Sequence, residues 1–156
     1  MTIRLVSIGK TQHAYLKQGI AMYLDRLQHY ARVEYVELPD VAQQGLSADQ
    51  LKQREADLIL KNVKADHVLF LLDEHGKEYT SREMAAFFQK QMNAGTKTLV
   101  LLIGGAFGFA PAIHERAAGK ISMSRLTLPH ELIRLFLVEQ VYRAHTILKG
   151  EKYHHD

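Results

Sequence analysis

Five short apolar runs, separated by longer segments with helical periodicity, dominate the hydrophobic pattern of this chain. The runs are bounded by turn or helix-start residues and cover Ile3–Ile8, Val33–Leu38, His67–Leu72, Thr98–Ile103 and Ile121–Leu126. Short apolar runs between turn signals are typical of buried strands. Because such strands alternate with helices over the whole length, the pattern predicts an α/β domain whose largely parallel sheet has about five or six strands and is flanked by helices.

Amphipathic helices are expected in the segments between these runs. In the first segment a single apolar stripe at helical spacing is formed by Leu16, Ile20, Tyr23, Leu24 and Leu27. Ser47 followed by Gln50, and Thr80 followed by Glu83, have the spacing of a capping box. These two pairs predict where the second and third helices begin.

The last helical segment, residues 130–148, has apolar residues on two faces. They are Ile133, Leu137, Val141, Ala144 and Leu148 on one side, and Leu135, Val138 and Tyr142 nearly opposite. One face can cover the sheet, while the other requires a partner subunit or a further helix of the same chain. Glu139 and Arg143 lie four residues apart on the helix surface between these two faces, and a pair at this spacing is usually exposed to solvent. Pro111 and Pro129 lie where first-turn prolines are favoured.

Composition narrows the class of protein. The chain has 156 residues, of which 47% are hydrophobic and 24% charged, so we expect one folded domain over residues 1–156. With no cysteine it has no thiol nucleophile, disulfide or cysteine-ligated metal. No signal peptide or membrane-spanning run is visible, which predicts a cytoplasmic protein that does not enter a membrane. A formal net charge of +3 permits a nucleic-acid partner without requiring one.

A cluster of glycines directly follows the fourth apolar run. Gly104, Gly105 and Gly108 let the backbone turn tightly at a strand end and let a flat ligand approach closely. The spacing is GGxxG, which differs from the GxGxxG dinucleotide fingerprint, and no phosphate-binding P-loop occurs. By itself the cluster fits a tight turn as well as a ligand-binding loop.

Two further strand ends are candidates for the same pocket. Residues 123–131 connect the fifth run to the last helix, and their alternating side chains leave backbone amides available to read a planar base. Leu72 and Asp73 close the third run. Because parallel strands end at the same edge of a sheet, these segments are expected to converge with the glycine cluster. An ordinary strand-to-helix connection is the alternative for residues 123–131.

Hydrolase and metal motifs are not complete. His130 and Glu131 begin a near match to HExxH, but Arg134 replaces the second histidine ligand, so no zinc protease site is expected. The GxSxG and SxxK motifs do not occur. We therefore expect no metal. His154 and His155 lie side by side in the terminal segment, where a solvated tail is the simplest interpretation.

Longer motifs give a more specific indication. The stretches VSIGK, LLDEHGKEYTS, LLIGGAFG, SMSRLTLPH and LVEQVYRAHTILKGEKYHH follow one another along nearly the whole chain. In this order the sequence resembles the ribosomal RNA large subunit methyltransferase H family, which is of the SPOUT class. The resemblance implies a homodimeric methyltransferase that uses S-adenosyl-L-methionine to methylate N3 of the pseudouridine at position 1915 of 23S rRNA within the ribosome. It also implies the SPOUT-type α/β knot, a deep trefoil knot in the carboxyl-terminal half.

The resemblance also assigns site residues. It places the cofactor on Leu72, Gly104, Met123, Ser124, Arg125, Leu126, Thr127 and Leu128. In the carboxyl-terminal segment His154 is the candidate base, with His155 as the alternative, and Tyr153 and Arg143 would orient the RNA or stabilise the imide. A dimer would let the tail of one subunit approach the cofactor of the other. The alternative function is a non-catalytic ribosome- or RNA-binding module with the same fold, against which the intact glycine, SMSRLTLPH and Tyr-His motifs argue.

Overall fold

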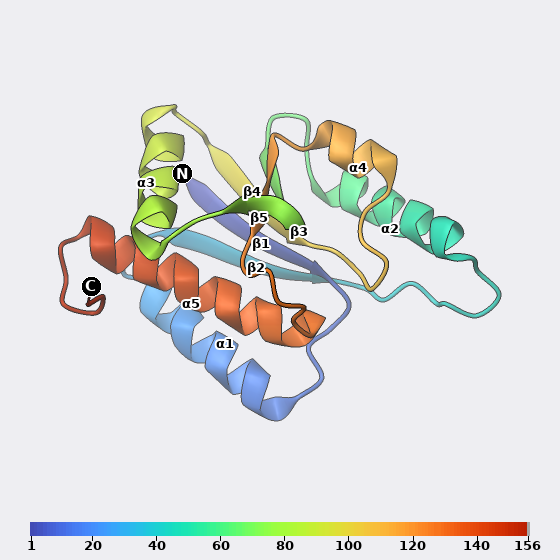
Figure 1. The fold of residues 1–156 in the computed structure, drawn as a ribbon, viewed down its shortest axis with the longest axis horizontal. Helices are drawn as coiled ribbons and strands as arrows, with labels where there is room; N and C mark the ends of the chain where they lie inside the picture. Colours follow the sequence, from blue (N-terminus) through green and yellow to red (C-terminus); the bar gives the residue numbers. More distant parts are fainter. Residues whose placement is uncertain (156) are drawn as a thin grey trace.

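The computed structural model describes residues 1–155 and builds them around one five-stranded sheet (Figure 1). The strands are β1 (Thr2–Ile8), β2 (Arg32–Leu38), β3 (Val68–Glu78), β4 (Thr98–Ile103) and β5 (Gly119–Ser122). The helices are α1 (Ala14–Leu27), α2 (Ala48–Asn62), α3 (Ser81–Asn93), α4 (Pro111–Arg116) and α5 (His130–Leu148). The strand order is β2-β1-β4-β3-β5, and every neighbouring pair is parallel. The predicted α/β architecture with a parallel sheet is confirmed.

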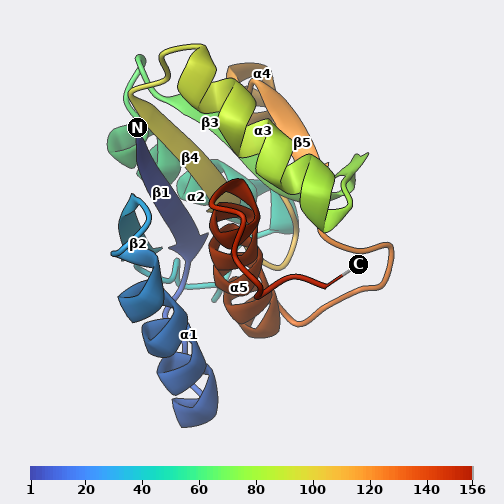
Figure 2. The same ribbon diagram turned by 90° about the vertical axis from the view of Figure 1, so that its left-hand side faces the viewer.

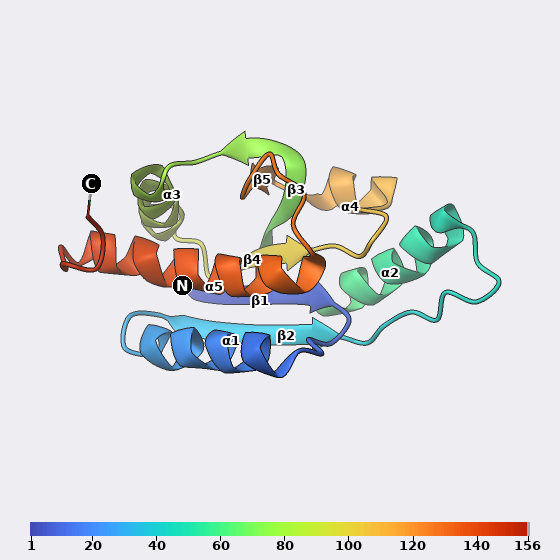
Figure 3. The same ribbon diagram turned by 60° about the horizontal axis from the view of Figure 1, so that its bottom comes forward.

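Strand β4 is buried on both faces of the sheet. Leu99, Leu101 and Ile103 pack with α1, α3 and α5, whereas Val100 and Leu102 pack with α2 and α4. Successive side chains of a strand point to opposite faces, so a continuous apolar run needs a cover on each side. Figure 2 shows α5 between α1 and α3 on the first face of the sheet. Figure 3 shows α2 and α4 side by side, away from these three helices.

Both predicted capping boxes are present. The Ser47 hydroxyl accepts a hydrogen bond from the Gln50 amide at 3.2 Å, and the Gln50 side chain accepts one from the Ser47 amide at 2.9 Å. Thr80 and Glu83 make the same reciprocal pair at the start of α3. Each pair satisfies two backbone donors that a helix start leaves without an intrahelical acceptor.

The two prolines have different positions. Pro111 is the first residue of α4, as predicted. The prediction for Pro129 is wrong by one residue, because Pro129 caps α5 and the helix begins at His130. The Pro129 carbonyl accepts the Ile133 amide at 3.1 Å, which is the role of a capping residue.

Strands β3 and β5 do not have the predicted bounds. β3 continues past Leu72 to Glu78, with an irregular pairing between Leu72 and Lys77, and β5 ends at Ser122, four residues before the predicted end. Gly76 permits the irregularity, since a β carbon there would lie 2.6 Å from the backbone of Ile121. Residues 123–129 thus leave the sheet as a loop, which the alternation of polar and apolar residues did not distinguish from a strand.

The second apolar face of α5 is covered within the chain. Val138 and Tyr142 are buried, and Leu135 packs on Gly19 of α1, where a β carbon would lie 3.0 Å from the leucine side chain. The sequence left open whether a partner subunit or another helix of the same chain covers this face, and in the structure α1 covers it. This face no longer argues for a dimer.

Threading of the chain is a separate property from strand order. The order and direction of the strands do not specify whether the carboxyl-terminal half passes through a loop. The trefoil knot implied by the resemblance therefore stays a prediction. The assignment of residues 1–156 to one domain stays a prediction as well.

Candidate active site

Three segments that follow or interrupt the neighbouring strands β3, β4 and β5 line one cavity of about 550 Å³. They are residues 72–75 of β3, where its regular pairing with β4 and β5 stops, residues 103–109 at and after the end of β4, and a set from residue 123 to residue 133 in the loop after β5 and the first turn of α5. Residue 114 of α4 completes the wall. The three predicted segments converge as expected, although the one at Leu72 lies within β3 and not at its end, and a cavity of this size can hold most of a small-molecule ligand.

The glycine loop forms a tight turn at the cavity wall. The Gly108 amide donates to the Gly105 carbonyl at 3.2 Å, and Gly108 has a φ of +76°, in the left-handed region that favours glycine. Gly104 is needed for a different reason: a β carbon there would lie 2.9 Å from the Phe109 ring. On the far side, Glu55 of α2 closes on Gly105, where a β carbon would lie 2.4 Å from its carboxylate. The loop is therefore packed too closely for side chains at Gly104 or Gly105.

Asp73 gives the cavity a fixed negative charge. Its carboxylate accepts the His75 amide at 2.9 Å and lies 3.6 Å from Lys120 Nζ. Partial burial alone would raise the pKa of Asp73, but the His75 hydrogen bonds and the Lys120 charge outweigh it, so the pKa lies below its ordinary value. An ionised carboxylate beside apolar walls suits a ligand that carries hydroxyl groups or positive charge.

The loop after β5 supplies the third wall. The Ser124 hydroxyl accepts the Leu126 amide at 2.9 Å, and the Ser122 hydroxyl donates to the Ser124 carbonyl at 3.1 Å, so the segment turns away from the sheet. Seven of the eight predicted cofactor residues line the cavity: Leu72, Gly104, Met123, Ser124, Leu126, Thr127 and Leu128. Arg125 is not among the lining residues. Its side chain is 87% exposed and pairs with Glu78 at 3.4 Å.

Further lining residues were not assigned to the cofactor from the sequence. His75, Phe107, His114, His130 and Ile133 border the cavity. Phe107 lies inside the glycine motif and His130 inside the candidate segment 123–131, so both carried a local signal. The other three lie on β3, α4 and α5, and their placement depends on packing between elements far apart along the chain.

The predicted catalytic residues form a second group, at the other end of α5. Arg143 donates from Nε to the Glu139 carboxylate at 3.0 Å and from Nη1 to His154 Nδ1 at 3.3 Å. The Tyr153 hydroxyl donates to the same Glu139 oxygen at 3.0 Å. The expectation that Glu139 and Arg143 form a solvated pair is wrong, because their side chains are only 15% and 24% exposed. We call Glu139, Arg143, Tyr153 and His154 the tail cluster.

Hydrogen-bond roles in the tail cluster determine where the His154 proton lies. A guanidinium only donates, so Nδ1 of His154 accepts from Arg143, and a neutral imidazole must carry its proton on Nε2. Burial raises the pKa of the Tyr153 phenol, and its hydrogen bonds to Tyr23 and Glu139 add to this, so Tyr153 remains protonated. In this arrangement both side chains act as hydrogen-bond donors. His155 is exposed and is not part of the cluster.

The tail cluster and the cavity are separated along α5. Ile133 borders the cavity and Arg143 lies ten residues further along the same helix. At 1.5 Å per residue this is about 15 Å along the helix axis. One chain therefore does not bring the predicted catalytic residues to the predicted cofactor residues.

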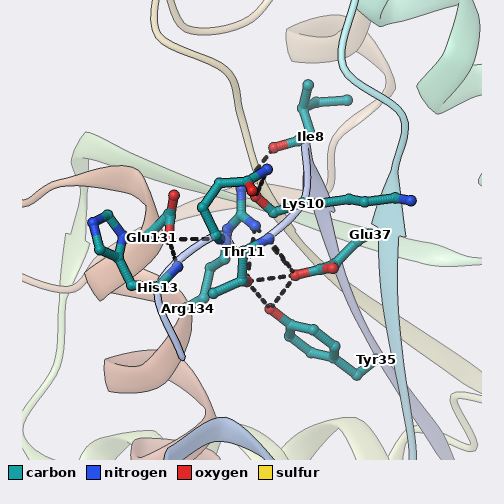
Figure 4. A network of polar contacts seen from close by, with 9 residues as sticks. Ile8, Lys10, Thr11, His13, Tyr35, Glu37, Glu131 and Arg134 are labelled. Carbon is teal, nitrogen blue, oxygen red and sulfur yellow. Dashed lines mark hydrogen bonds and ion pairs between the residues drawn. The ribbon is translucent and has the colours of Figure 1, made fainter. Parts of the chain in front are cut away.

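A buried polar network fixes the first turns of α5 beside the cavity (Figure 4). Arg134 is fully buried and donates to the Ile8 carbonyl at 2.8 Å and to the Thr11 hydroxyl at 3.0 Å, while its Nη1 lies 3.3 Å from Glu37. One turn earlier, Glu131 accepts the Gln12 amide at 2.9 Å and pairs with His13. The near match to HExxH thus belongs to a network that binds α5 to the loop after β1.

Neither a metal site nor a membrane span is found in the part of the chain that the structure describes. Within residues 1–155 no group of three or more histidine, aspartate or glutamate side chains could hold a metal ion. No helix within that range is long and apolar enough to cross a membrane.

Comparison with known proteins identifies similar chains. The profile of a family described as "Predicted SPOUT methyltransferase" matches residues 1–154. A "Ribosomal RNA large subunit methyltransferase H" of Cytophaga hutchinsonii is 49% identical over 99% of this chain and 100% of its own length. One from Porphyromonas gingivalis is 46% identical over the full length of both. Among solved structures, a probable methylase family protein of Haemophilus influenzae Rd KW20 shares the fold with a TM-score of 0.52 at 13% identity, over 99% of this chain and 70% of that one.

Proposed function

The chain belongs to the ribosomal RNA large subunit methyltransferase H family of SPOUT methyltransferases, and we propose that it transfers a methyl group from S-adenosylmethionine to N3 of a pseudouridine in 23S rRNA. The observation that carries the proposal is the cavity that residues 72–75 of β3 and the segments after β4 and β5 line together. The segments around it are those that the resemblance assigns to the cofactor. The identity of 46–49% to proteins named for this activity, over nearly the full length of the chain, supports the same substrate class.

The cavity fits the cofactor on its own features. Its volume of about 550 Å³ is sufficient, and at Gly104 a β carbon would have no room beside Phe109. Main-chain groups of residues 123–128 would read the adenine, and the ionised Asp73 would face hydroxyl or ammonium groups. When bound, S-adenosylmethionine supplies an electrophilic methyl group on a sulfonium that leaves as a neutral thioether.

The tail cluster suits the acceptor side of the reaction. N3 of a pseudouridine is an imide nitrogen, and its deprotonated form spreads negative charge onto the two flanking carbonyl oxygens. His154, with its proton on Nε2, would donate a hydrogen bond to one of these oxygens, and the Arg143 cation would favour the anion. The imide proton would then pass to water. We therefore assign His154 the role of donor in place of the base expected from the sequence.

Two copies of the chain would complete the site. Reacting atoms must approach to about 3–3.5 Å, whereas the tail cluster lies about 15 Å along α5 from its own cavity. We propose that the chain works as a homodimer in which the tail of one subunit reaches the cavity of the other. Each subunit would then supply the cofactor pocket of one site and the tail cluster of the second.

The proposal is tested with ribosomes that lack this methylation. Protein and isotope-labelled S-adenosylmethionine are added, and the modified nucleotide is located by mass spectrometry. We expect one labelled methyl group on a 23S pseudouridine. Cofactor binding in calorimetry without any transfer to RNA would instead support the non-catalytic binding module, and the absence of both would remove the assignment of the cavity.

A further inference from the structure

The chain after α5 folds back on the body of the protein (Figure 1). Gly150 has a φ of +70°, and the Glu151 amide donates to the Thr146 carbonyl at 3.0 Å. A left-handed glycine with such a bond ends a helix and reverses the chain direction. The terminal residues are thereby brought back toward α1.

Two tyrosines, one on α1 and one in the turn that follows it, form hydrogen bonds with these terminal residues. Tyr30, in the turn between α1 and β2, donates its hydroxyl to the Glu151 carboxylate at 2.6 Å. The hydroxyl of Tyr23, on α1, lies 3.2 Å from that of Tyr153. The Tyr142 ring contacts all three other rings, with centroids 5.7 Å from Tyr23, 5.6 Å from Tyr30 and 4.8 Å from Tyr153. We call Tyr23, Tyr30, Tyr142 and Tyr153 the tyrosine clamp.

The hydrogen-bond partners show which of these hydroxyl groups donate and which accept. Tyr153 has one hydroxyl proton, and it is donated to Glu139. The Tyr23 hydroxyl must therefore be the donor in its contact with Tyr153. The hydrogen bond to Glu151, with a smaller effect of burial, raises the pKa of Tyr30 to about 12 and keeps this phenol a donor. In both contacts a tyrosine of α1 or of the turn after it donates the hydrogen bond, and a residue of the tail accepts it.

We propose that Tyr23 and Tyr30 are positioning residues for methyl transfer, because their hydroxyls hold the tail so that Tyr153 and His154 stay in register with Glu139 and Arg143. The proposal rests on the proposed function, since the tail needs a defined position only if it meets the substrate. Chain ends are poorly ordered unless they are tied down. A tail that spends less time in the competent position lowers turnover by the same fraction.

The size of the effect follows from the two hydrogen bonds. An ordinary hydrogen bond changes the equilibrium constant between the held and the released tail about five-fold. Tyr30→Phe and Tyr23→Phe each keep the ring packing and remove only the hydroxyl. We expect each to lower kcat by up to about five-fold and the double variant to lower it more. Affinity for S-adenosylmethionine should not change, because the cavity lies at the other end of α5.

The experiment uses the full-length chain and ribosomes that lack the methylation. Turnover, KM for ribosomes and calorimetric affinity for S-adenosylmethionine are measured for the two variants. Tyr15→Phe is the matched control, since Tyr15 is 65% exposed. Glu151→Gln retains an acceptor for Tyr30 and should keep most of the turnover, whereas Glu151→Ala should match Tyr30→Phe. Hydrogen exchange of the amides of residues 151–155 reports tail order independently of catalysis.

The outcomes separate this proposal from the function on which it rests. Faster tail exchange with reduced kcat, unchanged cofactor affinity and an unchanged melting temperature supports the positioning role. Wild-type kcat in the Tyr23→Phe, Tyr30→Phe double variant overturns it while the methyltransferase assignment stands. A wild-type protein that transfers no methyl group removes both.

Discussion

Arg134 Nη2 donates a 2.8 Å hydrogen bond to the carbonyl oxygen of Ile8, which joins the second turn of α5 to the last residue of β1. The guanidinium is fully buried, and its charge is compensated by Glu37 of β2. Because Ile133, the neighbour of Arg134, borders the cavity, this contact also sets where the cavity wall lies.

Arg134→Met should be strongly destabilising. The substitution removes the buried donor to the Ile8 carbonyl and the cationic partner of the Glu37 carboxylate, and we expect a loss of about 3 kcal/mol in urea-induced unfolding. The low end of the usual range applies because the Glu37 side chain is 24% exposed. Arg54→Met on the exposed face of α2 is the control and should change stability by less than about 0.5 kcal/mol. Equal effects of the two variants would contradict a structural role for Arg134.

Glu131 should make stability depend on acid pH. Hydrogen bonds from the His13 side chain and the Gln12 amide lower the pKa of this carboxyl to about 2, from an ordinary value of 4.5. Its stabilising contribution is therefore complete above pH 4.5 and is lost as the pH falls toward 2. Glu131→Gln should lower the melting temperature at pH 7, and the difference from wild type should shrink between pH 4.5 and 2.

Thermal unfolding of both proteins across this pH range checks the prediction. Glu115→Gln, at an exposed position of α4, serves as the reference. A melting-temperature difference that stays constant from pH 7 to pH 2 would show that the Glu131 charge does not stabilise the fold.

Gly104→Ala should weaken cofactor binding. A β carbon 2.9 Å from the Phe109 ring forces this ring to move, and Phe109 lines the cavity. Overpacking of this kind costs about 1–3 kcal/mol, so we expect S-adenosylmethionine affinity to fall about 5- to 140-fold in calorimetry, and further for Gly104→Val. In a Phe109→Leu background the added methyl group has room, and the same substitution should have a smaller effect. An equal loss in both backgrounds would place the cause elsewhere than at this ring.

Mixed subunits should test the shared site. Gly104→Val removes the cofactor pocket and His154→Ala removes the tail donor, so each protein alone should be nearly inactive. If tail and cavity come from different subunits, a hybrid dimer contains one intact site, and a randomised equal mixture should recover about one quarter of the wild-type rate. Methyl transfer to ribosomes is measured before and after exchange of subunits. No recovery, in hybrids whose formation light scattering and tagging have verified, would place both halves of the site in one chain.

Local signals in the sequence were sufficient for most of the architecture. The alternation of apolar runs and amphipathic segments predicted the five strands, and Thr80 with Glu83 predicted the start of α3. Local signals failed at the end of β5, since the pattern predicts one strand over residues 121–126 but the chain leaves the sheet after Ser122 and turns through the Ser124 hydroxyl. They also failed for Glu139, whose spacing to Arg143 is that of a surface pair.

By itself, the sequence determined the α/β class, the glycine loop and the order of the motifs, because periodicity and turn chemistry depend on residues close together along the chain. Only the tertiary structure decided that Arg134 is buried and joins α5 to β1, that α1 covers the second face of α5, and that the tail cluster lies about 15 Å along α5 from its own cavity. These are distances between residues far apart in sequence, and they are set by how α5 packs on the sheet.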